Sequence, residues 1–199
     1  MITKKKASHQ AREKVRNEPV LVTVNLEEGL PRLRNERENA CVLRAIRASQ
    51  ERFGCRVVAS STLSNHLHLL LEAENEEKLS QAMKGLQVRI ARALNKLWGR
   101  KGAVFADRFH NRVLKTFGQI RNAVRYVLQN ARKHGISVEK DKPDPYSSGP
   151  WYRFWSERMN QPFRVDDCPV AEPRTAQLIK ACTHVPIGLN ELPAWCDRW

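Results

Sequence analysis

Two histidines one residue apart, His66 and His68, are the side chains of this sequence whose spacing first suggests chemistry. They open the stretch HLHLLLEA, whose apolar run is typical of a buried β-strand. Side chains at alternate positions of a strand point to the same face of a sheet. The spacing therefore predicts that both imidazoles project together from a rigid surface, where they can bind one metal ion.

Two further candidates, Tyr126 and Asn130, lie four residues apart in the segment that we expect to form the last helix of the main domain, residues 117–134. Residues at i and i+4 share a face of a helix, so a helix packed on the sheet can direct both toward the histidines. Asn130 would then complete a metal site through its side-chain oxygen, and Tyr126 would stand beside the metal.

The ligand types indicate which metal and which reaction to expect. Two neutral imidazoles and an amide oxygen, without a thiolate, favour Mg²⁺ or Mn²⁺ over structural zinc. Such an ion can hold a phosphodiester next to a tyrosine hydroxyl. The combination predicts attack of the phenolate on phosphorus, with a phosphotyrosine link that keeps the bond energy for rejoining.

The elements that must position these side chains follow the order β-α-β-β-α-β and then a final helix. Apolar periodicity predicts strands over residues 19–26, 55–64, 66–73 and 103–116, and helices over residues 35–53, 76–98 and 117–134. This order is typical of the split βαβ fold, a ferredoxin-like or RRM-like α+β architecture with an antiparallel sheet. We expect helices on one face, the other face open to a ligand, and an extra C-terminal helix followed by an irregular tail. In the first helix, the predicted core stripe consists of Val42, Ile46, Ser49 and Phe53.

Composition divides the chain into three regions. We expect a basic flexible arm over residues 1–18, the main domain over residues 19–140, and a Pro- and Trp-rich appendage over residues 141–199. The net charge of +14 belongs to the first two regions, because residues 1–140 hold 28 basic and 13 acidic residues. A domain this basic most often meets a polyanion, and nucleic acid is the commonest one. The candidate phosphate contacts form two groups, which are Arg89, Arg92 and Lys96 on the long helix and Arg108, His110 and Arg112 on the fourth strand.

Several classes of protein are disfavoured. The chain has no apolar run of roughly 18 residues that could span a membrane. Its basic N-terminus lacks the apolar centre of a signal peptide, and its five cysteines include no CxxC pair. We therefore expect a cytoplasmic protein that contacts no membrane.

The segments NHLHLLLE and RYVLQNARKHG together resemble a known family. The first resembles the HUH motif, and the second resembles the tyrosine helix of the one-tyrosine HUH transposases, most closely the REP-associated tyrosine transposases. The resemblance extends over roughly residues 18–152, because DPYSSGPW is also similar to a segment that follows that helix. It implies that His66, His68 and Asn130 bind a divalent metal and that Tyr126 forms a 5′-phosphotyrosine. It also implies single-stranded cleavage next to DNA hairpins at repetitive extragenic palindromes, without ATP.

One departure from the family concerns the helix that carries the tyrosine. Family members often have Asn-Pro in this segment, whereas this chain has Asn130-Ala131, which favours an unbroken helix.

Alternative interpretations stay open at this point. One is a non-catalytic module that holds single-stranded nucleic acid on an open sheet, and another is a host-retained regulator that binds repeats. A zinc site is a third, on the group formed by Cys168, Cys182, His184 and Cys196. The sequence also leaves a homodimer open.

Overall fold

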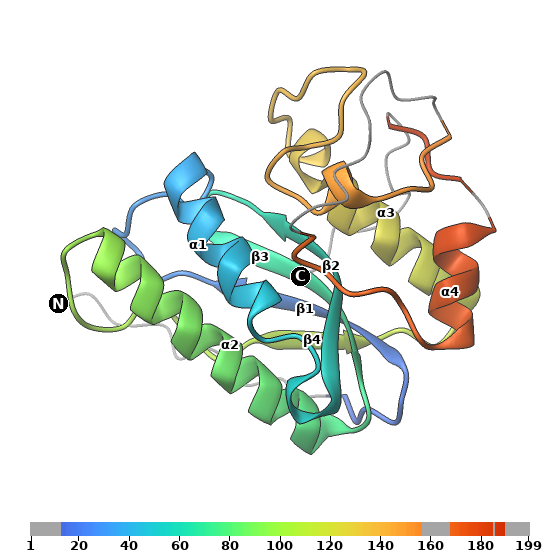
Figure 1. Cartoon of the computed structure of the whole chain (residues 1–199), viewed down its shortest axis with the longest axis horizontal. Coiled ribbons are helices and arrows are strands. Elements are labelled where there is room, and N and C mark those ends of the chain that lie inside the picture. Colours follow the sequence, from blue (N-terminus) through green and yellow to red (C-terminus); the bar gives the residue numbers. More distant parts are fainter. Residues whose placement is uncertain (1–12, 157–167, 185, 190–199) are drawn as a thin grey trace, which may run out of the picture.

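A computed structural model of the chain describes residues 13–156, 168–184 and 186–189 (Figure 1). Four strands form one antiparallel sheet in the order β2-β3-β1-β4. The strands are β1 (Pro19–Asn25), β2 (Cys55–Thr62), β3 (His66–Ala73) and β4 (His110–Val113). The helices are α1 (Glu36–Arg47), α2 (Glu76–Leu97), α3 (Phe117–Lys133) and α4 (Ala176–Thr183), with short 3-10 turns η1 (Arg52–Gly54) and η2 (Gly149–Trp151). This order confirms the predicted ferredoxin-like α+β fold.

Local sequence signals set the helix starts that matter for the site. Asn75 precedes α2, and its side-chain oxygen accepts a hydrogen bond from the backbone N–H of Lys78 at 2.9 Å. Thr116 and Gln119 form a capping box at the start of α3, in which each side chain bonds to the backbone of the other residue. The capping box fixes where α3 begins and therefore which of its residues face the sheet.

The first helix is shorter than its periodicity predicts. Val42 and Ile46 are buried as expected, but α1 ends at Arg47. Glu51 and Phe53 both have positive φ values, 59° and 57°, which a right-handed helix does not allow. The prediction that Phe53 packs in the core is wrong, because this turn leaves its side chain 43% exposed.

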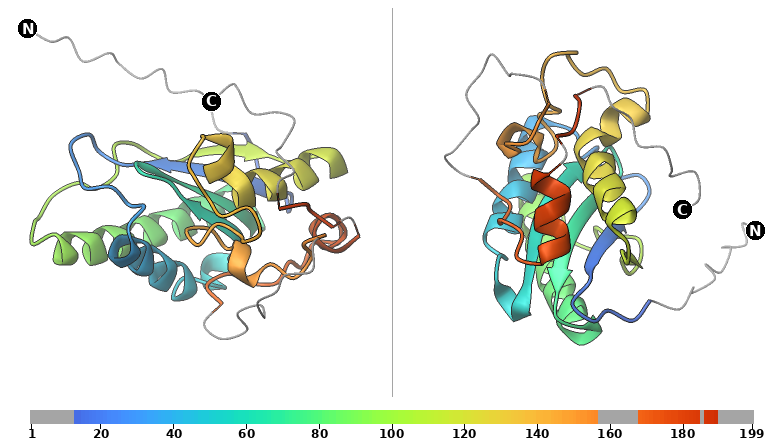
Figure 2. Two further views of the ribbon diagram at one scale, coloured as in Figure 1. Left: turned by 90° about the horizontal axis from the view of Figure 1, so that it is seen from above. Right: turned by 90° about the vertical axis from the view of Figure 1, so that its right-hand side faces the viewer.

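Both faces of the sheet are covered, which corrects the prediction of an open face. On β1, Val20, Val22 and Val24 join a core with α1 and α2, whereas Leu21 joins a second core with α3. The sheet thus lies between α1 and α2 on one side and α3 on the other (Figure 2). A strand buried on both faces needs apolar residues at successive positions, which is why Leu69, Leu70 and Leu71 are all buried.

The fourth strand is also shorter than predicted. β4 comprises only four residues, His110–Val113. Further upstream, Phe105 makes only an isolated bridge to Leu26. Arg108 lies in the irregular segment between Phe105 and β4.

The described residues after α3 lie along the edge of the sheet at β2 and complete the second core. Thr62 N–H donates to the carbonyl of Tyr146 at 2.7 Å, and Ser148 N–H donates to the carbonyl of Ser60 at 2.8 Å, so the segment DPYSSGPW lies along the edge of β2. The apolar side chains that join α3 in the second core include Trp155, Leu178, Ala181, Ile187 and Leu189. Trp195 and Trp199 lie outside the described residues. No helix in the described part of the chain is long and apolar enough to cross a membrane.

The described end of the N-terminal region, from residue 13, contacts the main domain. Val15 is buried, and Asn17 N–H donates to the carbonyl of Glu74 at 3.1 Å. Most of the predicted arm, residues 1–12, lies outside the described residues.

Candidate active site

His66 and His68 lie side by side on the face of β3 that packs against α3. Their ring centroids are 4.7 Å apart and the ring planes meet at 83°. The neighbouring residues Leu67 and Leu69 point to the opposite core, as strand alternation requires. The structure therefore brings the two predicted histidines together on one surface.

One nitrogen of each imidazole is already engaged by a neighbouring side chain. Nδ1 of His68 lies 2.9 Å from Oγ1 of Thr23, and Nδ1 of His66 lies 2.8 Å from Oδ1 of Asn65. Histidines that bind metals usually form such a bond at the nitrogen that does not touch the metal. The arrangement leaves Nε2 of both rings for the site.

Both imidazoles are neutral at physiological pH. Burial lowers the pKa of His66 to about 4, with a smaller contribution from His134. Burial also lowers the pKa of His68 well below its usual range, and the neighbouring His66 adds to this effect. A neutral imidazole keeps the lone pair that a metal ion requires.

Tyr126 reaches the histidines from α3. Its hydroxyl oxygen lies 3.2 Å from Nε2 of His68, and the two ring centroids are 4.9 Å apart. The tyrosine side chain is only 3% exposed. The predicted meeting of a phenol with the histidine pair is thus present in the structure.

Asn130 lies in the chain between two residues that approach the histidines. Tyr126, four positions before it, contacts His68, and His134, four positions after it, lies with its ring centroid 6.1 Å from that of His66. Asn130 is fully buried, and neither atom of its side-chain amide has a hydrogen-bond partner among the described residues. A buried amide without partners is costly, so its oxygen is well suited to bind a cation at this place.

These residues fit a divalent metal with mixed nitrogen and oxygen ligands. Among the described residues, no three His, Cys, Asp or Glu side chains form a metal-binding group. The candidate set differs because its third member is an amide, which coordinates through oxygen as Mg²⁺ and Mn²⁺ prefer.

Four residues of the site were not predicted from the sequence. Thr23 and Asn65 engage the histidines, and His134 approaches His66 from the end of α3. Lys133 places Nζ 5.4 Å from the centre of the Tyr126 ring, within the range of a cation–π contact. For His134 the sequence held a signal, since it follows Tyr126 by eight positions on a helix. For Thr23 it held none, because the pairing of β1 with β3 is needed to place Thr23 opposite His68.

The helix that carries these side chains is not continuous, which corrects the expectation of an unbroken helix. Gln129 has φ −118° and ψ 16°, outside the helical region, so α3 is kinked between Tyr126 and Asn130. Two contacts support the kink from the C-terminal segments. Oγ of Ser147 donates to the carbonyl of Leu128 at 3.4 Å, and the side-chain amide of Gln129 donates to the carbonyl of Gly188. The kink therefore needs no proline, since contacts from outside the helix stabilise it.

Comparison with known proteins identifies the family. The family model described as "Transposase IS200 like" matches residues 31–130, which is half of the chain and includes both histidines, Tyr126 and Asn130. The chain belongs to the IS200-like transposase family. It is therefore a DNA transposase or endonuclease.

One solved structure shares the fold of this IS200-like transposase. A REP-associated tyrosine transposase bound to a REP hairpin is 21% identical, with a TM-score of 0.57, and the match covers 71% of this chain and 82% of that one. A crystal structure from Deinococcus radiodurans R1, whose description names a transposase, is 15% identical, with a TM-score of 0.42, and the match covers 68% of this chain and all of that one. The comparison with curated proteins gives no match.

The two basic groups lie on different sides of the transposase. His110 pairs with Thr23 across β1 and β4, and Arg112 pairs with Leu21, so both project from the α3 face that holds the histidines. Arg108 is exposed just before β4. The second group, Arg89, Arg92 and Lys96, belongs to α2, which covers the opposite face of the sheet. Of the two groups, the structure therefore places His110 and Arg112 on the face that carries the tyrosine.

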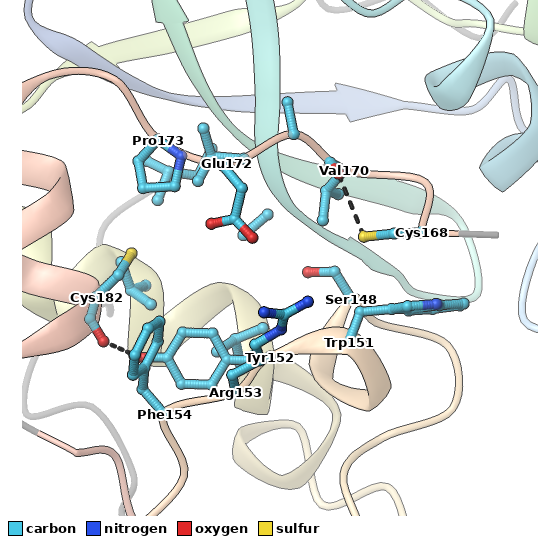
Figure 3. A pocket seen from close by; sticks show the side chains of 16 residues that line it. Ser148, Trp151, Tyr152, Arg153, Phe154, Cys168, Val170, Glu172, Pro173 and Cys182 are labelled. Carbon is cyan, nitrogen blue, oxygen red and sulfur yellow. Dashed lines mark hydrogen bonds between the residues drawn. The ribbon is translucent and has the colours of Figure 1, made fainter. Parts of the chain in front are cut away.

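A cavity near the site is separate from it. The cavity lies between β2, α3 and the C-terminal segment, and its walls are largely apolar, with Leu70, Val124 and Trp151 among them (Figure 3). His66, His68 and Tyr126 are not among the residues that line it. Two members of the alternative zinc group, Cys168 and Cys182, line this cavity, and Cys196 lies outside the described residues. Burial raises the pKa of Cys182 to about 12, which keeps its thiol protonated rather than in the form that binds zinc.

Proposed function

We propose that this IS200-like transposase is a divalent-metal-dependent endonuclease and strand transferase that cuts single-stranded DNA next to hairpins. The observation that carries the proposal is the 3.2 Å approach of the Tyr126 hydroxyl to the paired histidines. Tyr126 would be the nucleophile, and His66, His68 and Asn130 would hold Mg²⁺ or Mn²⁺. The ion supplies charge that polarises the scissile phosphate when it is bound.

The reaction balances without an energy source. The Tyr126 oxygen forms a bond to phosphorus while the bond from phosphorus to the 3′-oxygen breaks. The phenol loses its proton, and the leaving 3′-oxygen gains one to become a 3′-hydroxyl. The 5′-phosphotyrosine that results keeps the energy of the phosphodiester, so a second 3′-hydroxyl can attack it and rejoin the strands without ATP.

The proposed partner is hairpin DNA of the repetitive extragenic palindrome type. The relative with the same fold is described as bound to a REP hairpin, and this chain carries a net charge of +14. We propose that Arg108, His110 and Arg112 contact phosphates on the strand that leads to Tyr126. The α2 group, Arg89, Arg92 and Lys96, stays a prediction for a second contact region with the DNA.

The alternative of a non-catalytic RRM-like module has less support. Such modules bind single strands on an open sheet, whereas α3, against which α4 packs, covers this sheet face here. Tyr126 approaches His68 within one chain, and a homodimer stays a prediction. A host-retained regulator with a working site remains compatible with this proposal, because retention in the host changes the role of the protein and not its chemistry.

The proposal can be tested with labelled hairpin DNA from the repeats of the source genome. The purified protein is incubated with Mn²⁺ and a single-stranded substrate that carries its label on the 3′ side of the expected cut. A 5′-phosphotyrosine link transfers this label to the protein, which is seen as a covalent band on a denaturing gel.

Variants assign the roles. Tyr126→Phe should bind the hairpin nearly as well as the parent but give no adduct, while Tyr146→Phe, a matched control at another tyrosine, should give the parental yield. His66→Ala should lose metal-dependent activity and keep its circular dichroism spectrum. Adduct formation by Tyr126→Phe at the parental rate, or equal cleavage in EDTA, would refute the proposed roles.

A further inference from the structure

Three side chains form a continuous line from the sheet to the helix that carries the nucleophile. Oγ1 of Thr23 lies 2.9 Å from Nδ1 of His68, and Nε2 of the same ring lies 3.2 Å from the hydroxyl of Tyr126. The exposed fractions of the three residues are 9%, 2% and 3%. No bulk water therefore competes for these contacts, so each of them is part of the buried structure.

A neutral imidazole can satisfy both hydroxyls in two ways. In one tautomer Nδ1–H donates to Thr23, and the Nε2 lone pair accepts the hydroxyl proton of Tyr126. In the other, Nδ1 accepts from Thr23, and Nε2–H donates to Tyr126. Only the first tautomer offers a lone pair on the side of the ring that faces α3 and Tyr126.

We infer that Thr23 positions His68 in the first tautomer, and that the Tyr126 hydroxyl and the metal ion compete for the same Nε2 lone pair. This inference rests on the proposed function, since it concerns the ion that His66, His68 and Asn130 would hold. Thr23 is a positioning residue, because it acts through His68 and touches neither DNA nor metal.

The sheet explains why the competition cannot be avoided at His68. Thr23 pairs directly with His68 across β1 and β3, so it faces Nδ1 from within the sheet. Nδ1 therefore points toward a neighbouring strand, where an ion would have to displace Thr23. Nε2 points toward α3, and a single lone pair cannot accept a hydroxyl proton and bind a cation together.

The competition has a direct meaning for the nucleophile. As long as Nε2 accepts its proton, the Tyr126 hydroxyl is held against the imidazole. Loss of that hydrogen bond releases the hydroxyl, so the binding of the cofactor and the release of the nucleophile are coupled through one nitrogen. His66 differs, since its Nδ1 bonds to the exposed Asn65, and the rings of His68 and His134 lie beside its own.

The test measures Mn²⁺ affinity without DNA, so it does not depend on cleavage. Free Mn²⁺ is followed by electron paramagnetic resonance in titrations of the full chain. Tyr126→Phe removes the competitor and should tighten binding by roughly two- to tenfold, the range expected for one neutral hydrogen bond. Thr23→Val should weaken binding by roughly 10- to 100-fold, Thr23→Ser should restore most of it, and Tyr146→Phe should change nothing.

A spectroscopic measurement reads the tautomer directly and needs no variant. The ¹⁵N chemical shifts of the His68 ring in the parent protein should show a proton on Nδ1 and a lone pair on Nε2, and Thr23→Val should mix the two tautomers. A proton on Nε2 in the parent would overturn the role of Thr23, as would unchanged affinity in Thr23→Val. Unchanged or weaker binding by Tyr126→Phe would overturn the competition, because a weaker site would mean that the hydroxyl is a ligand. If the parent protein binds no Mn²⁺, the metal site of the proposed function fails as well. If the parent binds Mn²⁺ and the Thr23 and Tyr126 variants bind it with the same affinity, only the inference is refuted.

Discussion

Replacing Arg34 by methionine should strongly destabilise the protein, because it leaves a buried carboxylate without its main partner. Arg34 contacts Asp144 through two hydrogen bonds of 2.8 and 3.0 Å. The Asp144 side chain is fully buried and the Arg34 side chain is 10% exposed. Arg34 also donates to the carbonyl of Thr62 at 3.2 Å and lies 4.5 Å from the centre of the Tyr146 ring. This cluster attaches the segment after α3 to the end of β2.

The magnitude follows from what remains after the substitution. Methionine preserves much of the arginine stem but none of its donors, so Asp144 keeps only the backbone N–H of Tyr146, at 3.0 Å. Removing one partner of a buried ion pair typically costs about 3–5 kcal/mol. With a urea m value of about 2 kcal/mol/M, the unfolding midpoint should fall by roughly 1.5–2.5 M.

Urea unfolding followed by circular dichroism measures this change, with two matched controls. Arg37→Met, an exposed arginine on α1, should change the free energy of unfolding by less than about 0.5 kcal/mol. The double variant Arg34→Met/Asp144→Leu should recover much of the loss, because no unpaired charge stays buried. A loss below about 1 kcal/mol in Arg34→Met would refute the reasoning, since Asp144 would then be reached by water.

Two further predictions concern pH and DNA. His66 has a pKa of about 4 in the folded chain against 6.5 in the unfolded chain, so its contribution to stability is complete above pH 6.5 and is lost as the pH falls toward 4. After allowance for partial exposure, the loss of stability between pH 7 and 4 amounts to about 1–2 kcal/mol, and urea unfolding in EDTA should detect it. His66→Gln should show a smaller loss over the same pH range. An equally steep pH dependence in His66→Gln would contradict the prediction. Arg112→Gln on the tyrosine face should weaken binding of the single strand that leads to the cut and lower the salt dependence by about one charge, while Arg92→Gln on α2 should leave that strand's affinity unchanged. Fluorescence anisotropy at several salt concentrations measures the DNA affinity of both variants. Equal losses of affinity in Arg112→Gln and Arg92→Gln would contradict a special role for the sheet face that carries Tyr126.

Much of the site follows from short-range periodicity. Alternation along β3 places His66 and His68 on one face, and four-residue spacing on a regular helix predicts one face for Tyr126 and Asn130. Both patterns depend only on neighbours in sequence, so they can be derived without knowing the fold. The ferredoxin-like order of elements is predictable for the same reason.

The remaining features depend on contacts between distant segments. Thr23 and His68 are 45 positions apart, and only the register of β1 on β3 joins them. The kink at Gln129 is supported by Ser147 and Gly188, which belong to segments without strong periodicity. The covering of the second sheet face had a local signal, the uninterrupted apolar run of β3, but that run is also compatible with a short buried helix segment.

The left-handed turn that carries Phe53 shows a different limit. Phenylalanine at this spacing extends the apolar stripe of α1, so periodicity favours a longer helix. Backbone strain at Glu51 and Phe53 is specified by how the turn joins β2, which no local pattern reveals.

With Tyr126 as the proposed nucleophile, its enclosure bears on which DNA the protein can cut. A hydroxyl with so little surface cannot attack a phosphodiester that merely diffuses past, because its oxygen cannot approach the phosphorus to bonding distance. A substrate must stay bound long enough for the packing around α3 to open. On the proposed mechanism, brief encounters with other single strands end without a cut, because the packing of one helix on the sheet keeps the hydroxyl enclosed.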